Sequence, residues 1–257
     1  MSKLCCVCFL SLIGLLWRTQ LFVEGQQPYL NNEQMDCYND RNYTDGYYCN
    51  GVATSCQAYL TFWSIPPYNT PANIGLLLGF DASIIADANN VSIFETIPTD
   101  TQLLIPVSNC SCSGKYYQYN TSYELRSGDT YFIVANDTYQ GLTTCQAMMA
   151  QNPYDSLNLT VGLKLLVPLR CACPTAKQTA AGAKYLLTFM SNWDDDVTSI
   201  SKLFGVEEQS VLDANELSES NVTYPFTPIL VPLKSKPSKI QRSVSPPPAL
   251  PPQIPTV

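Results

Sequence analysis

A repeated pattern of an apolar run, a proline and a Cys-x-Cys pair constrains the fold of this chain more than any other feature. The pair is Cys110-Ser111-Cys112 in the first copy and Cys171-Ala172-Cys173 in the second, whereas the third apolar run, Ile229–Pro232, has no cysteine after it. The prolines that end the three runs are 62 and 64 residues apart (168−106 and 232−168). A repeat at a nearly fixed interval predicts three structural units of one kind.

Each unit has the sequence signals of a strand, two helices and a return strand. The three opening strands are expected at residues 59–62, 122–125 and 185–189. Helix starts are predicted at Thr70-Pro71, at Gly128-Asp129-Thr130 and at Asp194-Asp195-Asp196, because these residues cap helices or suit the positive end of a helix dipole. The apolar runs are the return strands, so the chain is expected to be an α+β protein.

An asparagine closes the second helical segment of each unit. The three asparagines, 63 residues apart (152−89 and 215−152), are Asn89, Asn152 and Asn215. Asparagine tolerates the left-handed backbone conformation that ends many helices, and this conformation is expected here.

Composition excludes several classes of function. The net charge of −7 argues against nucleic acid and anionic lipid as partners, since both need a basic surface. The chain has no histidine, which removes Ser-His-Asp and Cys-His catalysis and histidine-ligated metals. A glycoside hydrolase would need two carboxylates at a defined separation in a deep cleft, and no such motif is visible. The chain is therefore expected not to be an enzyme.

The first 25 residues resemble a secretory signal peptide, with Lys3 before an apolar run. A membrane anchor is the weaker alternative, because Arg18 interrupts a run that is too short to span a bilayer. Removal of residues 1–25 leaves eight cysteines, which an oxidising compartment would join in four disulfides. Asn109-Cys110-Ser111 is a sequon expected to be skipped, and glycosylation is expected at the others: Asn42, Asn90, Asn120, Asn136, Asn158 and Asn221.

The eight cysteines permit 105 pairings, and their spacing does not choose among them. Cysteines two apart on a strand face one side and are too constrained to bridge each other, so each pair is expected to reach two partners. Zinc is the competing interpretation of paired Cys-x-Cys, and it is disfavoured by the oxidising compartment. Neither a metal nor a cofactor is expected.

These features divide the chain into six parts. Residues 1–25 are the signal peptide, 26–56 a cysteine-containing segment, 57–109, 119–170 and 183–234 the three units, and 235–257 a proline-rich stalk.

Several long strings resemble one family. They are Gln26–Tyr29, Tyr59–Ser64, Ala135–Gln140, Thr144–Ala147 and Cys171–Gln178. With the three units and the Cys-x-Cys pairs, they make the chain similar to the ectodomains of plant LysM receptor-like kinases. The branch is that of the chitin-perception co-receptors with an inactive kinase, and the three units are then LysM units.

The resemblance implies a disulfide pattern. Carried over to this sequence, the bridges common to the family join Cys37 to Cys112, Cys56 to Cys173 and Cys110 to Cys171. The same pattern leaves Cys49 to pair with Cys145.

The resemblance also implies a ligand and its site. N-acetylglucosamine oligomers lie in a shallow groove between two loops of a LysM unit, usually the middle one. The implied residues are Ser127, Gly128, Asp129, Thr130, Tyr131 and Phe132 in the first loop, and Asn152, Pro153, Tyr154, Asp155, Ser156 and Leu157 in the second. Thr130 and Tyr131 have an alternative role in starting and packing a helix. Kinase-active relatives have acidic residues at the positions of Gly128 and Phe132, so the ligand pose is open, and Tyr123 and Thr198 are fallback candidates.

The implied function is chitin perception at the extracellular face of the plasma membrane, with a kinase-active LysM receptor as co-receptor. A homodimer and a C-terminal membrane anchor outside this chain are part of the same expectation. The alternatives are a receptor for lipo-chito-oligosaccharide signals and a scaffold that binds no sugar.

Overall fold

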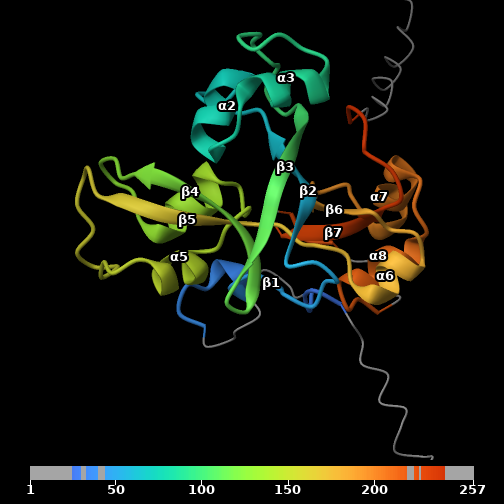
Figure 1. Cartoon of the computed structure of the whole chain (residues 1–257). Helices are drawn as coiled ribbons and strands as arrows, with labels where there is room; N and C mark the ends of the chain where they lie inside the picture. Colours follow the sequence, from blue (N-terminus) through green and yellow to red (C-terminus); the bar gives the residue numbers. More distant parts are fainter. Residues whose placement is uncertain (1–24, 30–32, 40–43, 219–222, 226, 241–257) are drawn as a thin grey trace, which may run out of the picture.

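The computed structural model describes residues 25–29, 33–39, 44–218, 223–225 and 227–240. The predicted signal peptide up to residue 24, the sequons at Asn42 and Asn221 and the stalk from residue 241 lie outside the described residues. The architecture is α+β, as predicted, with three helix-and-strand units, and the two strands of the first unit lie at the centre (Figure 1). None of the described helices is long and apolar enough to cross a bilayer.

Each unit runs strand, two helical segments, strand. Unit 1 consists of β2 (Ser55–Trp63), α2 (Pro71–Leu78), α3 (Ala82–Asn89) and β3 (Gln102–Ser113). Unit 2 consists of β4 (Tyr116–Glu124), α4 (Tyr131–Ile133), the π-helical turn η3 (Val134–Thr138), α5 (Cys145–Gln151) and β5 (Lys164–Arg170). Unit 3 consists of β6 (Tyr185–Met190), α7 (Val197–Phe204), α8 (Glu208–Ala214) and β7 (Pro228–Leu233). Three short elements lie outside the units: η1 (Glu33–Met35), β1 (Tyr47–Tyr48) and α6 (Ala176–Ala180).

The predicted helix starts are confirmed. The hydroxyl oxygens of Thr70 and Thr130 and a carboxylate oxygen of Asp196 each accept a hydrogen bond from the backbone N–H three residues later, at 3.1, 3.1 and 2.6 Å. Pro71 occupies the first position of α2, where a missing N–H costs nothing. The first helix of unit 2 departs from its counterparts, because α4 gives way after one turn to η3.

The strands of the three units join in one seven-stranded sheet within the described residues. Its order is β1-β4-β3-β2-β6-β7, with β5 on β4. Within each unit the two strands are antiparallel, and β2 and β6 of units 1 and 3 pair in parallel at Tyr59 and Leu60. Each unit thus contributes its own antiparallel pair of strands, and the pairing of β2 with β6 and of β3 with β4 joins these pairs into one sheet.

The three closing asparagines act through their side chains. In unit 1 the Nδ2 of Asn89 donates to the carbonyl oxygens of Ile85 (2.8 Å) and Leu104 (2.7 Å), and its Oδ1 accepts from the N–H of Leu104 (2.8 Å). Asn152 makes the same three bonds with Met148 and Leu166, and Asn215 makes them with Val211 and Leu230. Each asparagine therefore fastens the second helix of its unit to the return strand, and we call these contacts the asparagine clamps.

The expected left-handed conformation is wrong for these asparagines. Asn152 is extended (φ −123°), Asn215 has φ −111°, and in unit 1 the left-handed residue is the following one, Asn90 (φ 56°). The reason is that the amide of each asparagine must reach both the helix and the strand, and this requirement sets the local backbone.

Two of the four implied disulfides are confirmed and two are corrected. Cys56–Cys173 and Cys110–Cys171 are present. Cys37 pairs with Cys145 instead of Cys112, and Cys49 pairs with Cys112 instead of Cys145.

The position of the N-terminal segment explains the exchange. The register of β1 against β4 sets Tyr48 opposite Tyr116, and the N–H of Cys49 then donates to the carbonyl of Lys115 at 2.9 Å. This places Cys49 beside Cys112 at the end of β3, with 5.7 Å between the Cα atoms. Cys37 follows η1, which packs on α5, and its Cα lies 5.3 Å from that of Cys145.

A buried arginine helps to fix the N-terminal segment against unit 2. Arg170, 4% exposed, donates to Oε1 of Gln34 at 2.8 Å, and its guanidinium lies 5.0 Å from the ring centre of Tyr47. Burial lowers the pKa of Arg170, and Tyr47 and Asp45 act in the opposite direction. A buried charge is destabilising when its partners are removed. The contacts of Arg170 with Gln34 and Tyr47 therefore favour the docked position of the N-terminal segment.

The asparagine clamps should carry a large share of the stability. Replacing Asn215, which is fully buried, by alanine leaves the backbone groups of Leu230 without partners, so we expect the free energy of unfolding to fall by about 2–4 kcal/mol. The half-buried Asn152 is the matched comparison, and Asn152→Ala should cost less because water reaches the vacated groups. Urea denaturation measures both. Losses below about 0.5 kcal/mol in both variants would contradict the role of the clamps.

Mass spectrometry of the digested, unreduced protein should recover peptides that link Cys37 with Cys145 and Cys49 with Cys112. The same digest after reduction is the control, since all linked masses should disappear from it. A peptide linking Cys37 with Cys112 would contradict the described pairing.

Candidate functional site

The two loops of unit 2 that the resemblance implied for ligand binding lie side by side. A hydrogen bond from the hydroxyl of Tyr131 to the carbonyl oxygen of Tyr154, at 3.0 Å, joins loop 127–132 to loop 152–157. Tyr131 is only 2% exposed, so its ring packs inside the unit. Its position supports the alternative role in helix packing and makes it a support for the site.

The first loop is held by its own polar groups. The carboxylate of Asp129 accepts from the N–H of Arg126 at 2.7 Å and from the hydroxyl of Tyr123 at 3.0 Å. Gly128 has φ 89°, a left-handed conformation that favours glycine, and a Cβ at this position would meet no atom within 4 Å. The backbone of Gly128 is therefore open to an approaching molecule.

The second loop begins at the clamp of Asn152 and turns at Asp155. The carboxylate of Asp155 accepts from the N–H of Leu157 at 2.7 Å, and its carbonyl accepts from the N–H of Asn158 at 3.0 Å. This turn leaves the side chain of Leu157 86% exposed. Across the two loops, Leu157 and Phe132 (39% exposed) are the large apolar side chains that reach the surface.

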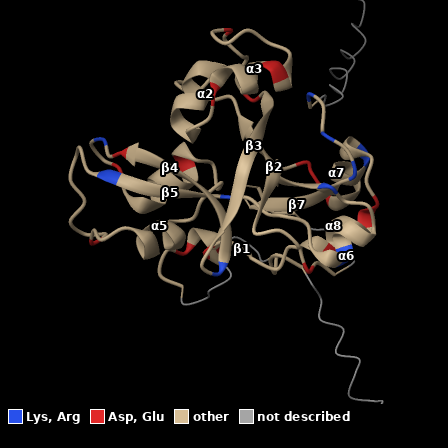
Figure 2. Ribbon diagram, viewed as in Figure 1, with Lys and Arg blue, Asp and Glu red and all other residues tan. Residues whose placement is uncertain are grey.

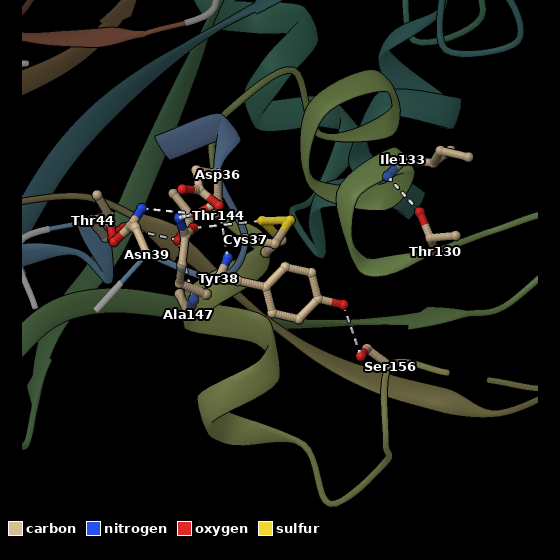
Figure 3. The surroundings of a disulfide bond; sticks show 12 residues. Asp36, Cys37, Tyr38, Asn39, Thr44, Thr130, Ile133, Thr144, Ala147 and Ser156 are labelled. Atoms are coloured by element: carbon tan, nitrogen blue, oxygen red, sulfur yellow. Dashed lines mark hydrogen bonds between the residues drawn. A yellow bond between two sulfur atoms is a disulfide. The ribbon is translucent and has the colours of Figure 1, made fainter. Parts of the chain in front are cut away.

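The N-terminal segment contributes a contact to this site that the sequence did not predict. The hydroxyls of Tyr38 and Ser156 lie 3.1 Å apart, and Tyr38 is 71% exposed (Figure 3). The neighbouring disulfide between Cys37 and Cys145 holds the segment against α5. The corrected pairing is the signal that would have placed Tyr38 beside the second loop.

The site suits an uncharged ligand. Burial, and then the hydrogen bond to Asp129, raise the pKa of Tyr123 to about 12, and burial raises that of Tyr131. Both hydroxyls are therefore neutral at physiological pH. Figure 2 shows lysines and arginines scattered over the elements rather than gathered on one of them. The two loops offer hydrogen-bonding groups and apolar cover, which is the pattern of a site for a neutral polar molecule.

The fallback residues are engaged in the fold. Tyr123 is 6% exposed, and the hydroxyl of the half-buried Thr198 donates to Oε1 of Glu208 at 2.9 Å. The aspartates before α7 cap it, as expected, through Asp196.

The sulfur atoms of Cys56, Cys110 and Cys173 lie within 4.8 Å of one another. They come together because two disulfides, Cys56–Cys173 and Cys110–Cys171, are neighbours. Sulfurs in disulfides are not thiolates and do not supply the ligands that zinc requires. This cluster is therefore a structural junction between β2, β3 and the segment after β5.

The predicted glycosylation sites differ in exposure. Asn90, Asn120 and Asn158 are exposed, whereas Asn136 is half-buried and donates to the carboxylate of Asp137 at 3.0 Å. Their glycosylation stays a prediction.

Three family models match the chain in order, one per unit. Residues 55–113 match the NFP/LYK LysM1 domain, residues 116–170 the LYK3/4/5 LysM2 domain, and residues 185–233 the LYK4/5 LysM3 domain.

Curated proteins and solved structures agree with these matches. The chain is 51% identical over 234 residues to Protein LYK5 of Arabidopsis thaliana, covering 87% of this chain and 34% of that protein. It is 28% identical over 144 residues to Chitin elicitor receptor kinase 1 of Arabidopsis thaliana, covering 56% and 22%. The crystal structure of the ectodomain of a receptor like kinase shares the fold, with a TM-score of 0.61 at 23% identity, covering 72% of this chain and 94% of that one.

The chain thus spans 34% of the length of LYK5 and 22% of the length of Chitin elicitor receptor kinase 1. Along this chain the three LysM models match in the order LysM1, LysM2 and LysM3. The chain belongs to the ectodomains of the LysM receptor-like kinases.

Proposed function

We propose that this chain is the extracellular, non-enzymatic ligand-binding part of a plant cell-surface receptor that binds N-acetylglucosamine oligomers through unit 2. The observation that carries the proposal is the pairing of the two loops of unit 2 by Tyr131; these loops also carry the exposed side chains of Leu157 and Phe132 and the open backbone of Gly128. Apolar side chains cover the faces of sugar rings, and backbone groups bond their N-acetyl amides. All twelve loop residues named from the sequence belong to this proposed site, with Asp129, Thr130, Tyr131 and Asn152 as supports.

The proposed signalling role needs a second receptor. A relative of this chain is named a chitin elicitor receptor kinase. We propose that a kinase-active LysM receptor of this kind joins the chain when a long oligomer binds both, and that a membrane anchor and an inactive kinase-like domain belong to the whole protein. Chitin perception in innate immunity is the response that this arrangement serves.

Leu157 should be essential for sugar binding. Leu157→Asp removes an apolar cover, and we expect the affinity for chitooctaose to fall about tenfold or more, because burying such a side chain contributes about 1.5–3 kcal/mol. Isothermal titration calorimetry measures the change. Folding should be unaffected, since the side chain is 86% exposed.

Unit 1 offers a matched control. Phe94 is 82% exposed and follows Asn89 by five residues, as Leu157 follows Asn152. It also lies in the corresponding turn of unit 1, where the N–H of Glu95 donates to the carbonyl of Ser92 at 3.1 Å. Phe94→Asp should leave the affinity unchanged. An equal loss in both variants would contradict the assignment of the site to unit 2.

The same titration separates the alternative ligands. Binding of a lipo-chito-oligosaccharide in preference to chitooctaose would identify a symbiotic receptor. No heat with either ligand would favour a scaffold that binds no sugar.

Tyr131 should support the site without touching the sugar. Tyr131→Phe removes the hydrogen bond to Tyr154 and leaves the ring in place, so we expect a loss of about 1 kcal/mol in the free energy of unfolding. Hydrogen exchange of the amides in residues 152–157 should become faster, because the bond that holds the second loop is lost. Unchanged exchange in this loop would show that Tyr131 does not position it.

A further inference from the structure

A groove lies between unit 1 and unit 2, on the side of β4 that faces α2. Its volume is about 680 Å³. Figure 1 shows α2 on one side of β4 and β5 on the other. Hydrogen bonds hold the end of α2 in place: the hydroxyl of Tyr119 donates to the carbonyl of Gly79 at 2.7 Å, and that of Tyr139 donates to the carbonyl of Leu77 at 3.1 Å.

The edge of β4 is open along this groove. β3 pairs with β4 only at residues 116–118 and then turns away to pair with β2. The N–H of Leu125 donates to the carbonyl of Leu163, so the odd-numbered residues of β4 exchange hydrogen bonds with β5. The backbone groups of Ser122 and Glu124 therefore point into the groove, where no described residue provides them with a hydrogen bond.

The groove is lined by apolar side chains and by the charged residues Glu124, Arg126 and Lys164. Leu76 of α2 is 84% exposed, Val161 after the second loop of unit 2 is 68% exposed, and the half-buried Tyr68 also lines the groove. At one end the lining includes Ser127, the first residue of the proposed sugar site. The groove and the proposed site therefore meet at this residue.

We infer that this groove binds further residues of the same N-acetylglucosamine chain, so that unit 1 helps unit 2 to select long oligomers. The inference rests on the proposed function of unit 2. Each N-acetyl group has one N–H and one C=O, which match the open backbone groups of Ser122 and Glu124. Leu76 and Val161 supply apolar cover for the sugar rings. A peptide strand would use the same edge, but the continuity with Ser127 and the short run of open backbone favour the sugar.

The exposed side chains of the groove allow a test that spares the fold. Leu76→Glu and Val161→Glu place carboxylates on the two walls, and Val52→Glu is the matched control, because Val52 is 67% exposed and does not line the groove. Calorimetric titration of the intact chain with chitotetraose and with chitooctaose gives the ratio of the two affinities for each protein. The added charge has no general effect on binding, since both ligands are neutral.

We expect the unmodified chain and Val52→Glu to bind chitooctaose about tenfold more tightly than chitotetraose, a difference of about 1.4 kcal/mol. In Leu76→Glu and Val161→Glu the affinity for chitotetraose should stay the same, and the affinity for chitooctaose should fall to a similar value. The preference for long oligomers is thus the quantity that the groove controls.

Other outcomes would overturn the inference. Equal affinities of the unmodified chain for both oligomers, or an unchanged ratio in the two groove variants, would reject the groove and leave the proposed function of unit 2 in place. Equal losses for both oligomers would make the groove part of the short-oligomer site. Loss of binding to a partner ectodomain with an unchanged ratio would make it a protein-binding surface. Failure of the unmodified chain to bind either oligomer would reject the proposed function itself.

Discussion

The side-chain amide of one asparagine in each unit joins the second helix to the return strand, and the remaining structure depends on this contact. A unit of about 50 residues has a thin core, so a buried amide that satisfies backbone groups on two elements at once has a large effect. The position of Asn152 also fixes where the second loop of unit 2 begins. In unit 3 the clamp extends further, because Gln27 donates to Oδ1 of Asn215 at 2.7 Å and so ties the N-terminal segment to it.

Disulfides and strand pairing turn the three clamped units into one body. Cys56–Cys173 and Cys110–Cys171 connect unit 1 to the segment between units 2 and 3, at the same place where β2 pairs with β6. The N-terminal segment then closes around unit 2 through Cys37–Cys145 and the buried Arg170. The proposed ligand loops are therefore carried on a rigid base, which limits the entropy lost when a flexible oligosaccharide is bound.

The chemistry of the proposed site depends on which of its polar groups are already engaged in the fold. Its aspartates accept hydrogen bonds from neighbouring N–H groups, and its tyrosine hydroxyls are neutral. What remains for a ligand is open backbone and exposed apolar side chains, at Gly128 and Leu157 in unit 2 and at Ser122 and Leu76 along the groove. Such surfaces favour a neutral polymer with amide groups, and the proposed extension of the site along the groove would give unit 1 a part in recognising the length of that polymer.

The sequence by itself determined the three units, their helix starts and the location of the loops, because caps such as Thr70 and Asp196 and the repeated apolar runs act over a few residues. Only the tertiary structure decided the partners of Cys37 and Cys49, since the register of β1 and the docking of η1 on α5 bring together residues far apart in the chain. The same reason explains why the contact of Tyr38 with the second loop and the open edge of β4 were not predicted. Local propensity says where a strand or helix begins, whereas pairing between distant segments is set by the packing of the whole chain.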